Sequence, residues 1–150
     1  MAHPERVVLI DGSNLVYRAF FALPGNLMTS SGLKTNAILG FATMFRKLFA
    51  AKTPALGAVV FDAPGKTFRD EKFPQYKATR ERMPDDLRAQ LPHVHRVCEA
   101  HGFRTLRVPG VEADDVIGTL TRLAVEAGHE VHIISTDKDF AQLVRDEVRL

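Results

Sequence analysis

The stretch Val7-Val8-Leu9-Ile10-Asp11-Gly12-Ser13-Asn14 decides the fold, because four apolar residues end at an aspartate and a turn follows. Such a run is typical of a strand buried on both faces, and the turn can cap a helix. Two further runs repeat the pattern: Ala58–Phe61 ends at Asp62, and Val131–Ser135 leads to Asp137. Because helix-like segments separate these runs, the sequence predicts a parallel sheet.

At least three strand–helix units follow one another with short connections. This order predicts an α/β fold, a doubly wound and mainly parallel sheet with helices on both faces. The other expected elements are a helix over Asn36–Ala51, a short helix opening at Asp85, a second helix restarting at Pro92 and ending near His101, a strand over Phe103–Val108, a helix from Val116 to Gly128, a helix starting near Asp137 and a strand beginning at Val148.

Seven carboxylates lie at or just past the ends of apolar runs. They are Asp11, Asp62, Glu112, Asp114, Asp115, Asp137 and Asp139. Open parallel sheets bind ligands beyond the carboxyl ends of their strands, so we expect these acids to meet in one crevice. Two bare carboxylates about 4 Å apart repel by about 4 kcal/mol at an effective dielectric of about 20. The crevice therefore needs protons or divalent cations to neutralise it.

The number of these acids favours metal binding over helix capping. A single aspartate after a strand is more simply explained as a helix cap, but the turns Val111–Asp115 and Thr136–Asp139 together hold five carboxylates. Oxygen ligands without cysteine or histidine partners favour Mg²⁺ or Mn²⁺ over zinc. A pair of such ions supports phosphodiester hydrolysis.

The composition narrows the remaining function classes. A chain of 150 residues with 45% hydrophobic content is long enough for one globular domain, and its net charge of +2 says little about nucleic-acid binding. The single cysteine, Cys98, excludes an internal disulfide and fits a reducing compartment. Neither a secretory signal nor a membrane-spanning segment is recognisable, so a cytoplasmic protein without a membrane partner is expected.

Two nucleotide-binding motifs are incomplete. Ala63–Thr67 is similar to the tail of a phosphate-binding P-loop, but Val60 stands where that loop needs glycine. The first strand is not followed by a Gly-x-Gly-x-x-Gly fingerprint. Neither a nucleoside triphosphatase nor a dinucleotide-dependent enzyme is therefore supported.

Between Gly65 and Pro84 the chain becomes basic and loses large apolar residues. Its cations are Lys66, Arg69, Lys72, Lys77, Arg80 and Arg82, and Phe68, Phe73 and Tyr76 lie among them. Cations interleaved with aromatic rings suit single-stranded nucleic acid, whose phosphates and bases they contact. From composition alone, an ordinary solvated loop explains this segment equally well.

Several motifs together resemble one known family, the 5′ nuclease domain of bacterial DNA polymerase I, within the structure-specific 5′ nuclease or flap endonuclease superfamily (resolvase-like, PIN-like fold). The motifs are Val-Leu-Ile-Asp-Gly-Ser-Asn (8–14), Val-Val-Phe-Asp-Ala-Pro-Gly-Lys-Thr-Phe-Arg (59–69), Tyr-Lys (76–77), Met-Pro-Asp-Asp-Leu (83–87), Gly-Val-Glu-Ala-Asp-Asp-Val-Ile-Gly (110–118) and Thr-Asp-Lys-Asp (136–139). They extend over nearly the whole chain and occur in the family's order.

The resemblance implies roles for individual residues. Asp11, Asp62, Glu112 and Asp114 would form the first metal site with Asp115 close by, and Asp137 and Asp139 would belong to the second. Residues 65–92 would form a basic helical arch that admits DNA. In it, Lys77 and Arg80 would contact the scissile phosphate as catalytic residues, Tyr76 would stack on a base, and Lys66 and Arg69 would add DNA contacts.

The resemblance also implies parts that the 150 residues lack. The family carries a downstream Gly-Asp-x-x-Asp motif and a helix-hairpin module that grips duplex DNA. We therefore expect residues 1–150 to be the N-terminal metal-binding part of the nuclease, with a complete first metal site, a deficient second one and impaired activity. The implied partners are DNA with a 5′ flap, a nick or a single-stranded 5′ end, and a C-terminal polymerase in the same polypeptide.

Two alternatives stay open. The first is a non-catalytic nucleic-acid-binding module on the same fold, which would need no metal. The second is a ribonuclease on a related acid-rich α/β fold, which the long basic segment disfavours.

Overall fold

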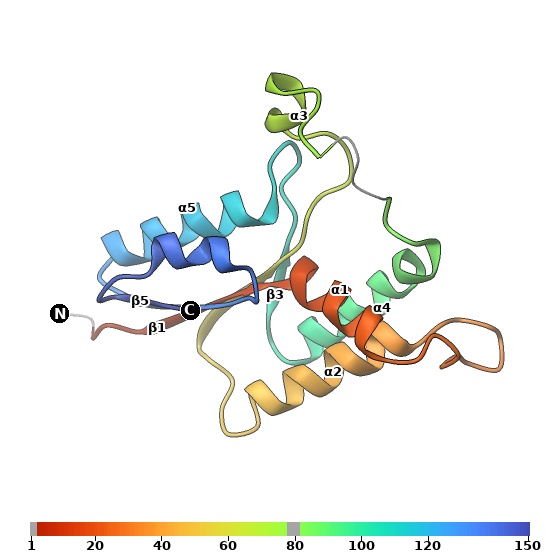
Figure 1. Ribbon diagram of the computed structural model, residues 1–150. Coiled ribbons are helices and arrows are strands. Elements are labelled where there is room, and N and C mark those ends of the chain that lie inside the picture. The colour runs from red at the N-terminus through yellow and green to blue at the C-terminus, as the bar shows by residue number, and fades with distance from the viewer. Residues whose placement is uncertain (1–2, 78–81) are drawn as a thin grey trace.

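A five-stranded parallel sheet forms the centre of the protein in the computed structural model, which describes residues 3–77 and 82–150. The predicted doubly wound α/β fold is confirmed (Figure 1). The strands lie in the order β3-β2-β1-β4-β5, with bounds β1 (Arg6–Asp11), β2 (Leu56–Val60), β3 (Arg104–Leu106), β4 (Glu130–Ile134) and β5 (Val148–Arg149).

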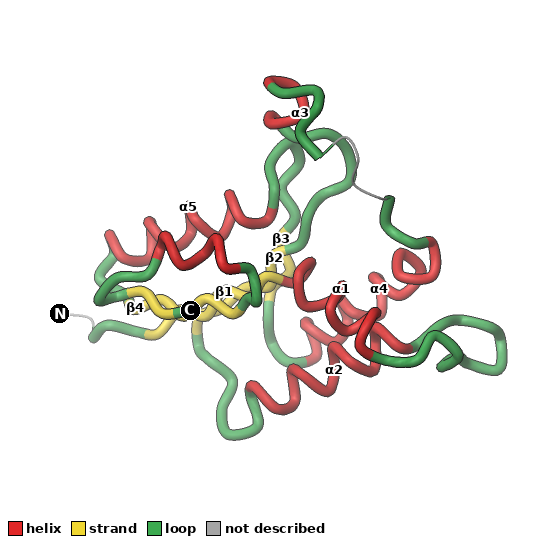
Figure 2. The backbone as a smooth tube through the Cα atoms, viewed as in Figure 1, coloured by secondary structure: helices red, strands yellow, loops and turns green. Residues whose placement is uncertain are grey.

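Helices cover both faces of the sheet (Figure 2). One face carries α1 (Gly12–Ala22), α2 (Asn36–Leu48) and α4 (Asp85–Ala100), and the other carries α5 (Ala113–Glu126) and the 3-10 helix η1 (Lys138–Leu143). The short helix α3 (Phe68–Lys72) stands apart from both layers, beyond the carboxyl end of the sheet. No helix among the described residues is both long and apolar enough to cross a lipid bilayer.

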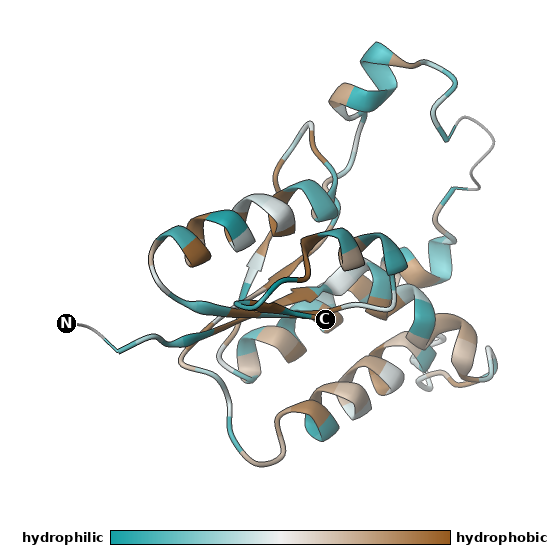
Figure 3. Ribbon diagram, turned by 60° about the vertical axis from the view of Figure 1, so that its left-hand side comes forward, coloured by the Kyte–Doolittle hydropathy of each residue, from teal (hydrophilic) through white to brown (hydrophobic). Residues whose placement is uncertain are grey.

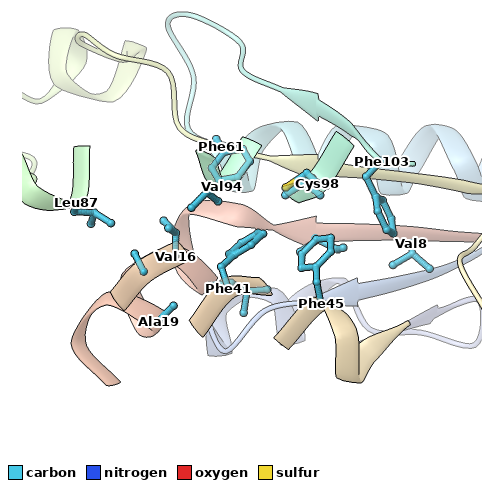
Figure 4. Close-up of a cluster of buried hydrophobic side chains, with 14 residues drawn as sticks. Val8, Val16, Ala19, Phe41, Phe45, Phe61, Leu87, Val94, Cys98 and Phe103 are labelled. Atoms are coloured by element: carbon cyan, nitrogen blue, oxygen red, sulfur yellow. The ribbon is translucent and has the colours of Figure 1, made fainter. Parts of the chain in front are cut away.

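Alternating residues of the strands feed two separate cores. Val8 joins Phe41 and Phe45 in the core beneath α1, α2 and α4 (Figure 4), and Ile10 belongs to the same cluster. Leu9, between them in sequence, points to the opposite core beneath α5. The buried middle of β1 and of β2 is accordingly apolar, whereas α3 is mostly hydrophilic (Figure 3).

The chain leaves the middle of the sheet in two directions, which creates a crevice at its carboxyl edge. From β1 the chain moves outward to β2 and β3, and it then returns to place β4 on the other side of β1. Ligands of open α/β sheets bind where the strand order reverses in this way. Asp11 ends β1 at this point, and Gly12 begins α1 so close to the sheet that a Cβ there would lie 2.7 Å from the Phe61 ring.

The sequence prediction was wrong about Pro92, because α4 runs through it as one helix of 16 residues. A proline inside a helix costs about 3 kcal/mol. Here Leu87 and Gln90 before the proline are fully buried, and so are Val94 and Cys98 after it. Burial on both sides holds the two halves of α4 on the same core, and Cys98 is the buried thiol that its spacing predicts.

Two other predicted helices differ from the structure, one in its end and one in its type. α2 stops at Leu48, since Phe49 leaves the helix to pack its ring 4.8 Å from that of Phe103. The helix expected near Asp137 is the 3-10 helix η1, because the Asp137 side chain accepts a hydrogen bond from the Asp139 N–H and tightens the turn.

Candidate metal centre

Asp11 lies at the floor of the crevice with 7% of its surface exposed. Its Oδ1 accepts the Asn14 N–H at 3.2 Å and its Oδ2 accepts the Ser135 hydroxyl at 3.0 Å. Burial raises the pKa of Asp11 to about 6, to which the nearby carboxylates of Asp62 and Asp137 also contribute. Without a bound cation, the ionised form of Asp11 is therefore disfavoured in the folded protein.

Asp62 joins the crevice from the loop after β2. Its backbone N–H donates to Ser13 Oγ at 2.8 Å, and its Oδ1 accepts the Ala113 N–H at 2.8 Å. The second bond places the carboxylate at the first turn of α5, where the helix dipole favours a negative charge. Asp62 thus connects the ends of β1, β2 and α5.

Glu112 precedes α5 and is surrounded by side chains of the basic segment. Its Oε1 accepts Lys77 Nζ at 2.9 Å, and its Oε2 accepts Arg69 Nη1 at 3.2 Å and the Tyr76 hydroxyl at 3.3 Å. Lys77 reaches this position from a backbone with φ of +53°, a left-handed conformation that is uncommon outside glycine. The chain's own cations therefore neutralise part of the acid cluster, a source that the sequence analysis did not consider.

Asp115 is held by one guanidinium. Arg69 Nη1 lies 2.5 Å from its Oδ2 and Arg69 Nη2 lies 2.6 Å from its Oδ1. This ion pair lowers the pKa of Asp115. The Glu112 N–H also donates to Asp115 Oδ2 at 3.0 Å.

Asp114 has a buried carboxylate oxygen, Oδ1, with no hydrogen-bond partner among the described residues. Burial raises the pKa of Asp114, and the charges of Glu112 and Asp115 raise it further. Oxygens of these three acids all lie within 4.8 Å of one another. A buried unpaired carboxylate oxygen is costly, so a missing positive partner is the simplest reason for this arrangement.

Asp137 and Asp139 follow β4 and line the other side of the crevice. The loop that carries them is fixed by Asn14, whose Oδ1 accepts both the N–H and the hydroxyl of Thr136, at 3.0 and 2.8 Å. The Asp137 N–H in turn donates to Ser135 Oγ at 3.0 Å. The ends of β1 and β4 are thereby joined by side chains.

The seven predicted acids divide between two adjoining hollows that share Asp114 and Asp137. The first, of about 530 Å³, is also lined by Asp11, Asp62 and Glu112. The second, of about 320 Å³, is also lined by Asp115 and Asp139. Each hollow has two cations in its wall, Arg18 and Lys77 in the first and Arg69 and Arg122 in the second, but the first has five acids and the second four. The first hollow is therefore the more negative of the two.

The predicted DNA-contacting residues do not share one environment. Arg69, Tyr76 and Lys77 bond to acids of the cluster, whereas Lys66 is exposed on the loop before α3. Arg80 lies outside the described residues. Their predicted roles on DNA stay predictions.

The sequence analysis missed three polar residues that shape the crevice: Ser13 and Asn14 were assigned only to a turn, and Ser135 to a strand. Each hydrogen-bonds to a predicted acid or to the loop that carries one. Their position in the sequence could have identified them, because each follows the apolar residues of β1 or β4 at the edge where the acids lie.

The donor set of the first hollow fits a hard divalent cation. All its charged ligand atoms are carboxylate oxygens, one of them is buried without a partner, and Asp11 resists ionisation. A divalent ion there would relieve both defects. Asp11, Asp62, Glu112 and Asp114 are the residues that could hold it.

Comparisons with known proteins agree on one family. Residues 6–150 match the family model described as 5′-3′ exonuclease, N-terminal resolvase-like domain. The chain is 51% identical over 144 residues to DNA polymerase I of Pseudomonas aeruginosa, a match that covers 96% of this chain and 16% of that protein. It is 45% identical over 144 residues to the 5′-3′ exonuclease of Aquifex aeolicus, covering 96% of this chain and 50% of that protein. The chain thus spans half or less of these relatives.

A solved structure shares the fold. The structure of T5 5′-exonuclease with divalent metal ions (zinc) bound superposes with a TM-score of 0.73 at 24% identity. The match covers 95% of this chain and 53% of that one. At this identity the likeness supports the fold alone.

Proposed function

Because the chain belongs to the family of the 5′-3′ exonuclease N-terminal resolvase-like domain, we propose that it is the metal-binding part of a 5′ nuclease. The proposed reaction is hydrolysis of phosphodiester bonds at DNA 5′ ends and 5′ flaps, with Mg²⁺ or Mn²⁺ as the cofactor. The observation that carries the proposal is the buried, unpaired Asp114 Oδ1 in the hollow that the desolvated Asp11 also lines.

The proposed division of labour follows from the positions of the side chains. Asp11, Asp62, Glu112 and Asp114 would hold a cation in the first hollow, where it would supply an ionised water and offset charge on the phosphate. Asp137 and Asp139 would serve a weaker second site, because four acids line that hollow and five line the first, with two cations in each wall.

The basic segment would bring DNA to this edge of the sheet. Lys77 borders the first hollow, and its ammonium could pass from Glu112 to a substrate phosphate once a cation takes over that carboxylate. Lys66 is exposed on the same side, and Tyr76 and Arg80 complete the proposed DNA-binding set. In this proposal the cations of the segment neutralise the acids when no substrate is bound, and they neutralise the substrate phosphates during the reaction.

A cleavage experiment tests the proposal. The protein is incubated with a labelled 5′-flap DNA and Mg²⁺ or Mn²⁺, and Asp114→Asn should reduce cleavage by at least about a hundredfold, because it removes a charged ligand and leaves the hollow intact. Glu126→Gln is the matched control on the same helix, since its side chain is 59% exposed and pairs only with Arg122 in the described structure. Cleavage that persists in Asp114→Asn would rule the assignment out.

One observation favours a second candidate, a DNA-binding module without catalysis. Arg69, Tyr76 and Lys77 already neutralise Glu112 and Asp115 without any metal. This candidate predicts that a chelator leaves DNA binding unchanged and that no substrate is cut. The unpaired oxygen of Asp114 argues against it, since the chain's own cations do not reach that atom in the described structure.

The longer relatives suggest a further part of the protein. Because the Pseudomonas relative is a DNA polymerase I of which this chain spans 16%, we propose a polymerase region in the same polypeptide. Reading the codons downstream of Leu150 tests this directly.

A further inference from the structure

The carboxylate of Asp115 has little capacity left for a cation. Arg69 occupies both of its oxygens, at 2.5 and 2.6 Å, and the Glu112 N–H takes another position on Oδ2 at 3.0 Å. An ionised carboxylate offers about four acceptor positions, so three of them are already used. Asp115 is thus engaged in a different way from Asp114, whose Oδ1 has no partner among the described residues.

The guanidinium of Arg69 is held from several directions. Its Cζ lies 4.7 Å from the centre of the Phe68 ring, and its Nη1 also contacts Glu112 Oε2 at 3.2 Å. The backbone supports this position, because the Phe68 N–H donates to the Gly110 carbonyl at 2.9 Å. The Arg69 side chain is only 28% exposed, and its guanidinium is already engaged by these contacts, so it is badly placed to bind a DNA phosphate.

The bond from Asp115 to the backbone of Glu112 connects this ion pair to the proposed cation ligands. It fixes the residue immediately before α5, and Glu112 and Asp114 project from this same turn. A loss of Arg69 would release Asp115, and the turn that aims both ligands would then be held less firmly.

We propose that Arg69 and Asp115 form a positioning pair that orients Glu112 and Asp114 toward the divalent cation. In this assignment Asp115 is not a cation ligand and Arg69 is not a phosphate contact, which differs from the roles that the sequence analysis gave them. The inference rests on the proposed function, because it requires a cation in the first hollow.

The direction in which Mn²⁺ affinity changes when Arg69 is removed distinguishes a positioning role from a purely electrostatic one. If Arg69 acted only through its charge, its removal would strengthen Mn²⁺ binding, since a positive charge would leave an acidic site. A positioning residue has the opposite effect, and loss of such a supporting partner typically weakens metal binding by roughly 10–100-fold.

The experiment is a calorimetric Mn²⁺ titration of the full protein, Arg69→Gln, Asp115→Asn and the double variant. We expect each single substitution to weaken Mn²⁺ binding roughly tenfold, and the double variant to bind no more weakly than either single one. Equal or tighter binding by Arg69→Gln, or additive losses in the double variant, would overturn the inference. Circular dichroism establishes that each variant is folded.

Arg69→Lys keeps the test valid if Arg69→Gln does not fold. It retains the charge and loses the two-bond geometry, so weakened Mn²⁺ binding is again expected and wild-type affinity would refute the pair. A wild-type protein without measurable Mn²⁺ binding would overturn the proposed function and this inference together. Wild-type Mn²⁺ binding with an unaffected Arg69 variant overturns the inference alone.

The salt dependence of DNA binding gives an independent readout. In a chelating buffer, Lys66→Gln should lower the slope of log affinity against log salt by about one, as expected for a lost phosphate contact. Arg69→Gln should leave this slope at the wild-type value. A decrease of about one for Arg69→Gln would assign it to the DNA and refute its positioning role.

Discussion

Replacing Asp11 with asparagine should stabilise the metal-free protein above pH 6. The carboxyl group is 7% exposed, and its pKa is raised from 3.8 to about 6, mainly by burial. Between these two pH values the folded protein binds more protons than the unfolded chain, so the free energy of unfolding falls as the pH rises. The loss is complete once the pH exceeds the pKa of the folded state.

The size of the effect follows from that interval. At about 1.4 kcal/mol for each tenfold change in proton concentration, ionised Asp11 costs the folded state about 3 kcal/mol. Asparagine keeps an oxygen that can accept the Asn14 N–H, and its amide can donate to the Ser135 oxygen, so both present contacts have a neutral replacement. The variant should therefore match the wild type near pH 3.5 and exceed it by up to about 3 kcal/mol at pH 8.

Urea unfolding followed by circular dichroism, in the presence of a chelator and at several pH values, measures this difference. Asp85→Asn serves as the control, because it makes the same chemical change at a side chain that is 90% exposed. Added Mn²⁺ at pH 8 should reduce or reverse the advantage of the Asp11 variant, since the cation stabilises the protein that binds it more tightly. A difference that is constant with pH, or an Asp11→Asn variant that is less stable at pH 8, would refute the reasoning.

Three further substitutions or reactions probe the scaffold. Gly12→Ala should lower the unfolding free energy by roughly 1–3 kcal/mol, because the new Cβ would lie 2.7 Å from the Phe61 ring. Gly25→Ala is the control: its Cβ would have no atom within 4 Å, so it should cost less than about 0.5 kcal/mol in the same denaturation assay. Gln90→Ala should lower the unfolding free energy by roughly 2–4 kcal/mol, because the buried amide donates to Asn36 Oδ1 and the Asp86 carbonyl and accepts the Ile38 N–H. A change in thermal melting below about 2 °C would contradict this. Burial raises the pKa of the Cys98 thiol to about 12, so a thiol reagent at pH 8 should label it only as fast as the protein unfolds, and rapid labelling of the folded protein would show that the thiol is accessible.

The strands and the acids that end them were predictable because both depend on local patterns. An apolar run followed by aspartate marks β1 and β2, and the shared direction of parallel strands brings Asp11 and Asp62 to one edge. Pro92 was misjudged for the opposite reason. Its local effect is to break a helix, whereas burial on either side of it comes from tertiary packing that no local pattern reveals.

The partners of the acids could not be predicted from sequence. Arg69 and Asp115 are 46 residues apart, and their pairing depends on where α3 stands relative to α5. Composition indicated a basic segment suited to nucleic acid, and it could not distinguish a cation turned toward solvent from one turned toward the acids. The same limit applies to Ser135, which lies 124 residues from Asp11 and reaches it only because β4 pairs with β1.

The distribution of the acidic side chains along the chain has a consequence during synthesis. The first hollow takes its carboxylates from the end of β1, from the loop after β2, from the start of α5 and from the loop after β4. The four proposed cation ligands are spread over residues 11–114, so a nascent polypeptide that ends before Asp114 does not contain the whole set. If the proposed function holds, a newly made chain would bind Mn²⁺ and cut nucleic acid only after the parallel sheet has brought these distant acids together.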